Sequence, residues 1–128
     1  MNLRVLVVED EALIALNLIC LLEDLGHLVL GPAATSAQAL ALASEGGIDL
    51  AFVDLNLLDG ATGASVARAL ASNPETTVVV VSATPAGLTA GEDGIFQIVK
   101  KPYADQTITQ VVSLVARRRA DDKARRER

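Results

Sequence analysis

The chain has 128 residues, which is enough for one ordinary domain and too short for two that each bury a core. Hydrophobic residues make up 51% and charged residues 21%, a balance that fits a packed globular domain and excludes disordered, collagen-like and low-complexity classes. Aromatic residues make up only 2%, which argues against a base-stacking platform for single-stranded nucleic acid. The single cysteine, Cys20, and the lack of a signal-like or membrane-spanning segment predict a cytoplasmic protein without membrane contact.

The net charge of −5 is unevenly distributed along the chain. From Ala116 onward seven basic residues stand against three acidic ones, so this segment carries +4 and residues 1–115 carry −9. The acidic body disfavours nucleic-acid phosphates and favours cations. Opposite charges four residues apart, such as Arg117 with Asp121, predict a solvated helical extension over 117–128 beside a domain at 1–116. No nucleic-acid partner is expected, and a role of the extension in a homodimer stays open.

Strand and helix patterns alternate along the chain. Short apolar segments rich in branched residues predict strands at 3–8, 27–30, 49–53, 76–81 and 95–99. Helical periodicity and capping residues predict helices at 12–25, 36–46, 62–71, 85–93 and from 105 through 115. Glycines within and beside 85–93 weaken the fourth helix, which we expect to be short or mobile. The alternation predicts an α/β domain with a doubly wound, five-stranded parallel sheet covered on both faces.

Four of the predicted strands are followed directly by polar or charged residues. Because the carboxyl ends of parallel strands meet at one edge of the sheet, these side chains should lie together. Carboxylates at close range need a neutralising cation, and Mg²⁺ is a hard ion that prefers oxygen ligands. A lysine and a hydroxyl beside the metal can bind an anion, so the group suits phosphoryl transfer to a carboxylate nucleophile. The residues concerned are Glu9, Asp10, Asp54, Ser82 and Lys101.

Four fragments of the sequence resemble the signatures of receiver domains in two-component response regulators. They are VLVVEDE at 5–11, VDLNLLDG at 53–60, VSA at 81–83 and KPY at 101–103, and the intervals between Asp10, Asp54, Ser82 and Lys101 are 44, 28 and 19 residues. The resemblance covers about residues 3–115. It implies a stand-alone, single-domain response regulator with the flavodoxin-like receiver fold, in which a histidine kinase or histidine phosphotransfer protein phosphorylates Asp54.

The same resemblance implies the roles of the other site residues. Ser82 and Lys101 contact the phosphoryl group. Adjacent strand residues point to opposite faces, so only one of Lys100 and Lys101 can enter the site, and the resemblance favours Lys101, the residue next to the proline. The Lys101–Pro102 peptide bond is a candidate for the cis form that is common in the family. The implied ligands of Mg²⁺ are Asp10, Asp54, the backbone carbonyl of Asn56 and, through water, Glu9.

The implied function is a phosphorylation-switched signalling module that acts through protein contacts or as a phosphate sink, without turning over an external substrate. Its expected contact surface is formed by the helix at 85–93, the fifth strand and the last helix, and the downstream partner is unspecified. Two alternatives stay open: a small Mg²⁺-dependent aspartyl-phosphate phosphatase and a phosphorylation-independent receiver-like adaptor. A flavin or nucleotide binder is disfavoured because the chain lacks a glycine-rich phosphate loop.

Two substitutions depart from the family pattern. Leu58 stands where the family usually has proline, so the loop after Asp54 is expected to differ in shape. Ile98 stands where many members carry Tyr or Phe, which puts the family's aromatic relay in question. Three further residues are expected to have structural roles: Cys20 in the core of its helix, His27 at the surface or capping a helix end, and Tyr103 packed against the domain.

Overall fold

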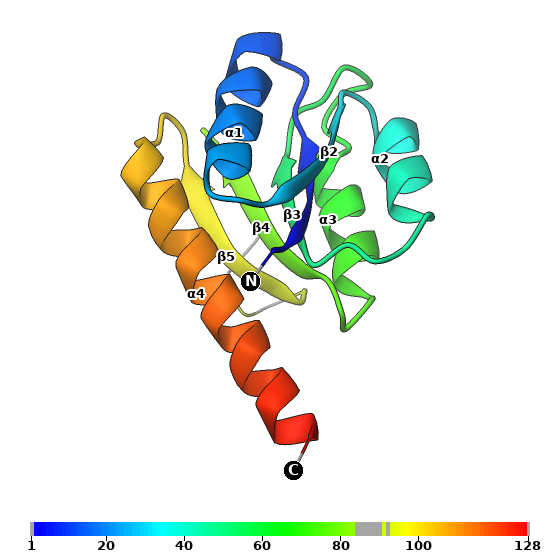
Figure 1. Ribbon diagram of the computed structural model, residues 1–128. Coiled ribbons are helices and arrows are strands. Elements are labelled where there is room, and N and C mark those ends of the chain that lie inside the picture. The colour runs from blue at the N-terminus through cyan, green and yellow to red at the C-terminus, as the bar shows by residue number, and fades with distance from the viewer. Residues whose placement is uncertain (1, 84–90, 92, 128) are drawn as a thin grey trace.

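The structure is a computed structural model that describes residues 2–83, 91 and 93–127 (Figure 1). The elements in these residues are β1 (Arg4–Val8), α1 (Ala12–Asp24), β2 (Leu28–Ala33), α2 (Ser36–Ala43), β3 (Leu50–Asp54), α3 (Gly63–Ala71), β4 (Thr77–Ser82), β5 (Ile95–Lys100) and α4 (Asp105–Arg126). The strands form one parallel sheet in the order β2-β1-β3-β4-β5, which confirms the predicted doubly wound fold. The helix predicted at 85–93 falls outside the described residues, apart from 91 and 93.

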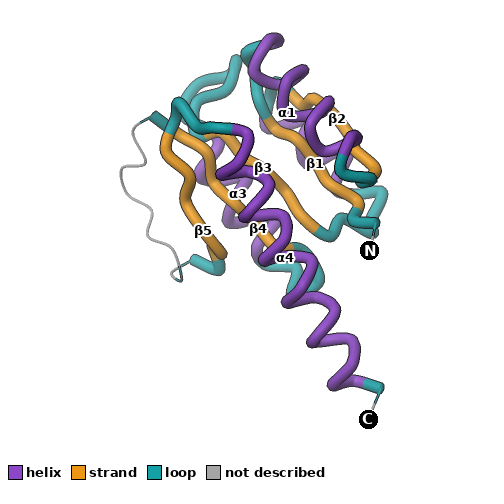
Figure 2. The backbone as a smooth tube through the Cα atoms, turned by 60° about the vertical axis from the view of Figure 1, so that its left-hand side comes forward, coloured by secondary structure: helices purple, strands orange, loops and turns teal. Residues whose placement is uncertain are grey.

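Helices cover both faces of the sheet, with α1 and α4 on one face and α2 and α3 on the other (Figures 1 and 2). Side chains alternate between the faces along each strand, so Val5 and Val7 pack toward α1 and α4, whereas Leu6 and Val8 pack toward α2 and α3. The central strands are buried on both faces, and Phe52 in the middle of β3 is only 1% exposed. This two-sided burial explains why continuous runs of branched residues predict these strands correctly.

The edge strand β2 runs farther than the sequence predicts because a bulge accommodates a proline. Its register with β1 shifts between the pairs of Leu6 and Val8, opposite Gly31 and Pro32. Proline is tolerated at an edge because one side of the strand needs no ladder hydrogen bonds. A Cβ atom at Gly31 would lie 2.6 Å from the backbone oxygen of Val7, and the residue has φ +110°, so this position favours glycine.

The prediction that Cys20 lies in the core is wrong, since the side chain is exposed. The buried residues of α1 are Ala15, Leu18 and Leu22. Cys20 lies two residues from Leu18, which places it about 200° around the helix and therefore on the opposite side. The apolar composition of this helix obscures which face is buried, because exposed Leu13 and Leu16 also belong to it.

The last helix, α4, continues unbroken past residue 116 and projects beyond the sheet (Figures 1 and 2). Its first half packs on the sheet through Ile108, Val111, Val112 and Val115. The expected ion pairs at four-residue spacing are absent from the described residues of this helix. Instead, Arg119 bonds to Asp49 at 2.7 Å, so the basic segment is attached to the domain. In the described part of the chain no helix is both long and apolar enough to cross a membrane.

Candidate functional site

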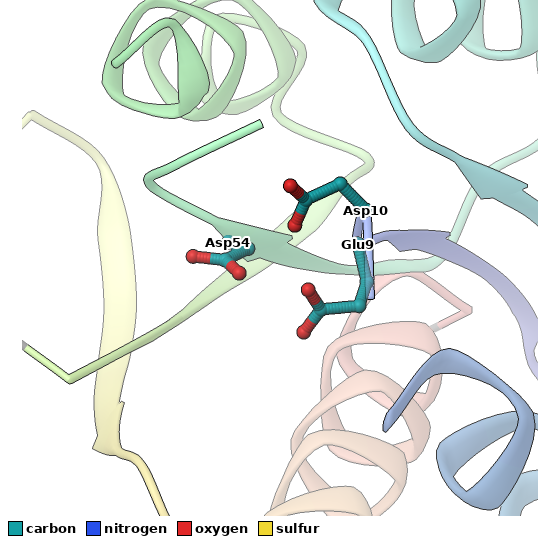
Figure 3. Close-up of side chains that lie close together, drawn as sticks. All are labelled: Glu9, Asp10 and Asp54. Atoms are coloured by element: carbon teal, nitrogen blue, oxygen red, sulfur yellow. The ribbon is translucent and has the colours of Figure 1, made fainter. Parts of the chain in front are cut away.

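Three carboxylates meet at the carboxyl edge of the sheet. Glu9 and Asp10 directly follow β1, and Asp54 is the last residue of the neighbouring strand β3. One carboxylate oxygen from each lies within 4.8 Å of the others (Figure 3). Glu9 is 5% exposed and Asp54 is 6% exposed, whereas Asp10 is half-buried. The structure thus brings together the three acidic residues that the sequence indicated.

Lys101 enters this cluster from the end of β5. Its Nζ lies 2.6 Å from Oε1 of Glu9 and 2.7 Å from Oδ2 of Asp54, so one ammonium group joins two strands. Its backbone N–H donates to the carbonyl of Ser82 at 3.0 Å. The preceding residue, Lys100, is exposed at the end of β5. The Lys101–Pro102 peptide bond is cis, which confirms that expectation.

Ser82 is fully buried at the end of β4, the strand between those that lead to Asp54 and Lys101. The Asp54 carboxylate is oriented by two donors, because its Oδ1 accepts the backbone N–H of Asn56 at 3.1 Å and its Oδ2 accepts from Lys101. The backbone of Asn56 is therefore folded back toward the acidic cluster. All the residues selected from the sequence lie along this edge.

The charges at this edge do not balance, since three carboxylates face one ammonium group. Burial is the main cause that raises the pKa of Glu9 to about 7; the neighbouring Asp54 acts in the same direction, and the hydrogen bond from Lys101 acts in the opposite direction. Burial alone would lower the pKa of Lys101, but its hydrogen bonds to Asp54 and Glu9 raise it, so the ammonium stays charged. The cluster therefore has the donor chemistry for a hard divalent cation: several carboxylate oxygens, one of them part-exposed, with an excess of negative charge.

Comparison with known proteins places this arrangement in a family. Residues 5–113 match the family model of the response regulator receiver domain. The chain belongs to this receiver family. It is 36% identical over 118 residues to the phyllosphere-induced regulator PhyR of Methylorubrum extorquens, and the match covers 88% of this chain and 43% of that relative.

Solved receiver structures share the fold. The receiver domain of the PhyR response regulator from Erythrobacter litoralis is 29% identical, with a TM-score of 0.79 and 90% of each chain covered. A mutant of PhyR from Bartonella quintana, described as an anti-anti-sigma factor, is 26% identical with a TM-score of 0.83, covering 94% of this chain and 51% of that one. The receiver therefore spans about half the length of the longer PhyR proteins that it matches.

Gly63 is a site residue of this receiver that sequence reasoning missed. A Cβ atom at this position would lie 1.9 Å from the backbone oxygen of Asp54 and 2.4 Å from Cα of Leu55. The Gly63 N–H donates to the carbonyl of Leu55 at 3.0 Å, so α3 begins directly against the end of β3. A glycine at the first position of a helix lowers helix propensity. This unfavourable residue was the feature of the sequence that could have pointed to a special role of position 63.

The loop after Asp54 is attached to the domain through the backbone of Leu58. The backbone N–H of Leu58 donates to the carbonyl of Ala34 at 2.9 Å, a bond that proline cannot make. The Leu58 side chain is 70% exposed, so the backbone rather than the side chain attaches the loop to the domain. Ile98 packs against the core cluster beneath α2 and α3, without an aromatic ring at that position of β5.

Two other residues singled out from the sequence have structural contacts outside the acidic cluster. His27 is half-buried, and its Nδ1 accepts the backbone N–H of Leu3 at 3.0 Å. Tyr103 packs against the core cluster beneath α1 and α4, as expected, and burial raises its pKa. Both positions therefore stabilise the scaffold around the site.

Proposed function

We propose that this receiver is a phosphorylation-switched module of a cytoplasmic two-component system, in which Asp54 accepts a phosphoryl group from a histidine kinase or histidine phosphotransfer protein. The proposal rests mainly on one observation: the ammonium group of Lys101 contacts both Asp54 and Glu9 at the edge of the sheet where three carboxylates meet. A carboxylate nucleophile next to an ammonium group and a cation-binding acidic cluster suits phosphoryl transfer.

In the proposed step, a carboxylate oxygen of Asp54 attacks the phosphorus atom of a phosphohistidine. The new P–O bond forms as the P–N bond breaks, and the imidazole of the donor leaves with the bonding electrons. Asn56 and Lys101 orient the Asp54 carboxylate before the reaction, since each donates a hydrogen bond to a different oxygen. Lys101 is within reach of the phosphoryl oxygens, and Ser82 at the end of β4 supplies a hydroxyl group to them.

The proposed ligands of Mg²⁺ are Asp10, Asp54, the backbone carbonyl of Asn56 and, through water, Glu9. When bound, Mg²⁺ supplies positive charge that offsets the negative charge of the phosphoryl group. The donor set supports this assignment because its oxygens converge and outnumber the one ammonium charge of Lys101. The same excess of negative charge supports a need for a cation before a dianionic phosphoryl group can approach Asp54.

The output of the module is proposed to be a contact with a downstream protein, or the removal of phosphoryl groups from a kinase. The Bartonella quintana relative is described as an anti-anti-sigma factor, but the receiver covers only 51% of that chain. We therefore propose a protein partner of unspecified identity, and no contact with nucleic acid. The acidic charge of residues 1–115 supports the second part of this statement.

The test is the intact mass of the protein after incubation with acetyl phosphate, in Mg²⁺ or in EDTA. We expect wild type to gain one phosphoryl group only with Mg²⁺, and Asp54→Asn to gain none. The matched control is Glu45→Gln, which removes an exposed carboxylate beyond the end of α2 and should behave as wild type. Acid-labile phosphate retained in Asp54→Asn would contradict the role of Asp54.

Two further results would favour the alternatives. Repeated turnover of a phosphate ester by wild type, lost in Asp54→Asn, would indicate a phosphatase. A folded wild-type protein that takes no phosphoryl group from acetyl phosphate or from a phosphorylated histidine phosphotransfer protein would indicate a phosphorylation-independent adaptor.

A further inference from the structure

The loop that follows Asp54 is held by a carboxylate outside the acidic cluster. Asp59 accepts hydrogen bonds from the backbone N–H and the hydroxyl of Ser36, at 3.2 and 2.5 Å, and from the hydroxyl of Thr62 at 2.8 Å. Ser36 is the first residue of α2, and Thr62 is the residue before α3. One exposed side chain therefore joins the starts of α2 and α3. These two helices cover the same face of the sheet (Figure 1).

The chemistry of a helix start explains why this contact needs a carboxylate. The first N–H groups of a helix have no partner within the helix, and the helix dipole favours negative charge there. In α2 the hydroxyl of Thr35 accepts the N–H of Gln38, but the N–H of Ser36 bonds to Asp59. The hydrogen bonds from Ser36 and Thr62 lower the pKa of Asp59, so the carboxylate is ionised at neutral pH.

The backbone between Asp54 and Asp59 is fixed at several points. Leu57 and Gly60 exchange two backbone hydrogen bonds, at 2.9 and 3.0 Å, which close a tight turn. The N–H of Leu58 donates to the carbonyl of Ala34, the residue after β2, and the N–H of Asn56 donates to the carboxylate of Asp54. The carbonyl of Asn56 therefore lies between two anchored points, one at Asp54 and one at the turn that Asp59 attaches to α2.

We propose that Asp59 is a positioning residue for the cation site: it holds residues 55–60 against the start of α2, so that the backbone carbonyl of Asn56 is preordered for a divalent cation. The inference rests on the proposed function, because it takes the Asn56 carbonyl as a ligand. Without the Asp59 contacts, the loop keeps its backbone bonds but loses its attachment to the start of α2, so cation binding must restrict the remaining motion, and this entropic cost weakens binding. Residues that orient metal ligands commonly affect affinity without touching the ion.

The experiment measures the dissociation constant of Mg²⁺ without any phosphodonor, by calorimetric titration, together with the melting temperature in EDTA. Asp59→Ala removes the carboxylate, and Thr62→Val removes one hydroxyl donor with little change in shape. Thr62→Ser restores the hydroxyl, and Glu45→Gln controls for the loss of one exposed negative charge. We expect the constant to rise about threefold to tenfold in the first two variants and to stay within about twofold of wild type in the other two.

The inference is overturned if Asp59→Ala or Thr62→Val binds Mg²⁺ as wild type does, since the contacts would then only cap helices and their loss would only lower the melting temperature. It is also overturned if Thr62→Ser binds as weakly as Thr62→Val. If Asp59→Ala does not fold, the two Thr62 variants decide the question. Failure of the proposed function has a different signature, because wild type would then bind no Mg²⁺, or Asp54→Asn would still gain a phosphoryl group.

Discussion

At the scale of single residues, the site is defined by how few positive charges it contains. Lys101 contacts Glu9 and Asp54, but the part-exposed Asp10 lies beside the same oxygens without a basic partner in the described residues. A second lysine would reduce the excess of negative charge that is available to a cation. The excess of negative charge is thus consistent with a site whose charge balance changes on binding.

His27 gives the receiver a pH dependence that is separate from the acidic cluster. Its Nδ1 accepts the N–H of Leu3, which only a neutral imidazole can do, and burial lowers its pKa below the ordinary value of 6.5. The folded state therefore binds this proton less readily than the unfolded chain. The stability that His27 contributes is complete above about pH 6.5 and is lost as the pH falls through the lowered pKa.

The prediction is tested by urea unfolding of wild type and His27→Gln between pH 8 and pH 5. Glutamine retains an acceptor but does not titrate, so the difference in unfolding free energy isolates the imidazole. Wild type should lose about 0.5 kcal/mol more than the variant over this range, a small value because the hydrogen bond is only partly buried. A difference that is constant with pH would show that the pKa of His27 is the same in the folded and unfolded states.

At the scale of secondary-structure elements, α3 can start where it does only because residue 63 is glycine. Gly63→Ala would place a Cβ atom 1.9 Å from the Asp54 carbonyl, so either α3 or the end of β3 must move. We expect a loss of about 2 kcal/mol in unfolding free energy, as for other overpacked sites, and slower phosphoryl uptake. Ser65→Ala, at an exposed position of the same helix, is the control and should retain both properties. Unchanged uptake in Gly63→Ala would show that the end of β3 tolerates the shift.

The elements also show which features the sequence could predict. Strands buried on both faces appear as uninterrupted runs of apolar residues, and the acidic residues after β1 and β3 converge because parallel strands end at one edge. The face of α1 could not be predicted, since its exposed side includes Leu13, Leu16 and Cys20. Contacts between loops were also inaccessible: the bond of Asp59 to Ser36, 23 residues away, depends on how distant segments meet, which residue spacing does not reveal.

At the scale of the whole molecule, the two ends of the sheet have different kinds of charge balance. At the amino end, Arg119 of α4 bonds to Asp49 and to the backbone oxygen of Glu75, so the charges of Arg119 and Asp49 are paired within the protein. At the carboxyl end, the carboxylates of Glu9, Asp10 and Asp54 share one lysine. The stability of the fold should therefore respond to cations mainly through the carboxyl end.

This asymmetry predicts that Mg²⁺ stabilises the receiver more at pH 8 than at pH 5. Without metal, the pKa of Glu9 is raised from 4.5 to about 7, so the folded state holds a proton that the unfolded chain has released. The contribution of Glu9 to stability therefore falls as the pH rises between these two values. A cation removes this penalty when Glu9 is ionised, but at pH 5 it must compete with the bound proton.

Melting temperatures in EDTA and in Mg²⁺ at both pH values test the prediction. At about 100 times its dissociation constant, Mg²⁺ adds about 2.7 kcal/mol to the stability of the folded state, which corresponds to a rise of several degrees at pH 8. Asp10→Asn should lose most of this rise, because it removes a proposed direct ligand, whereas Glu45→Gln should retain it. An equal rise at both pH values would show that the cation does not displace a proton from Glu9, and an undiminished rise in Asp10→Asn would place the cation elsewhere.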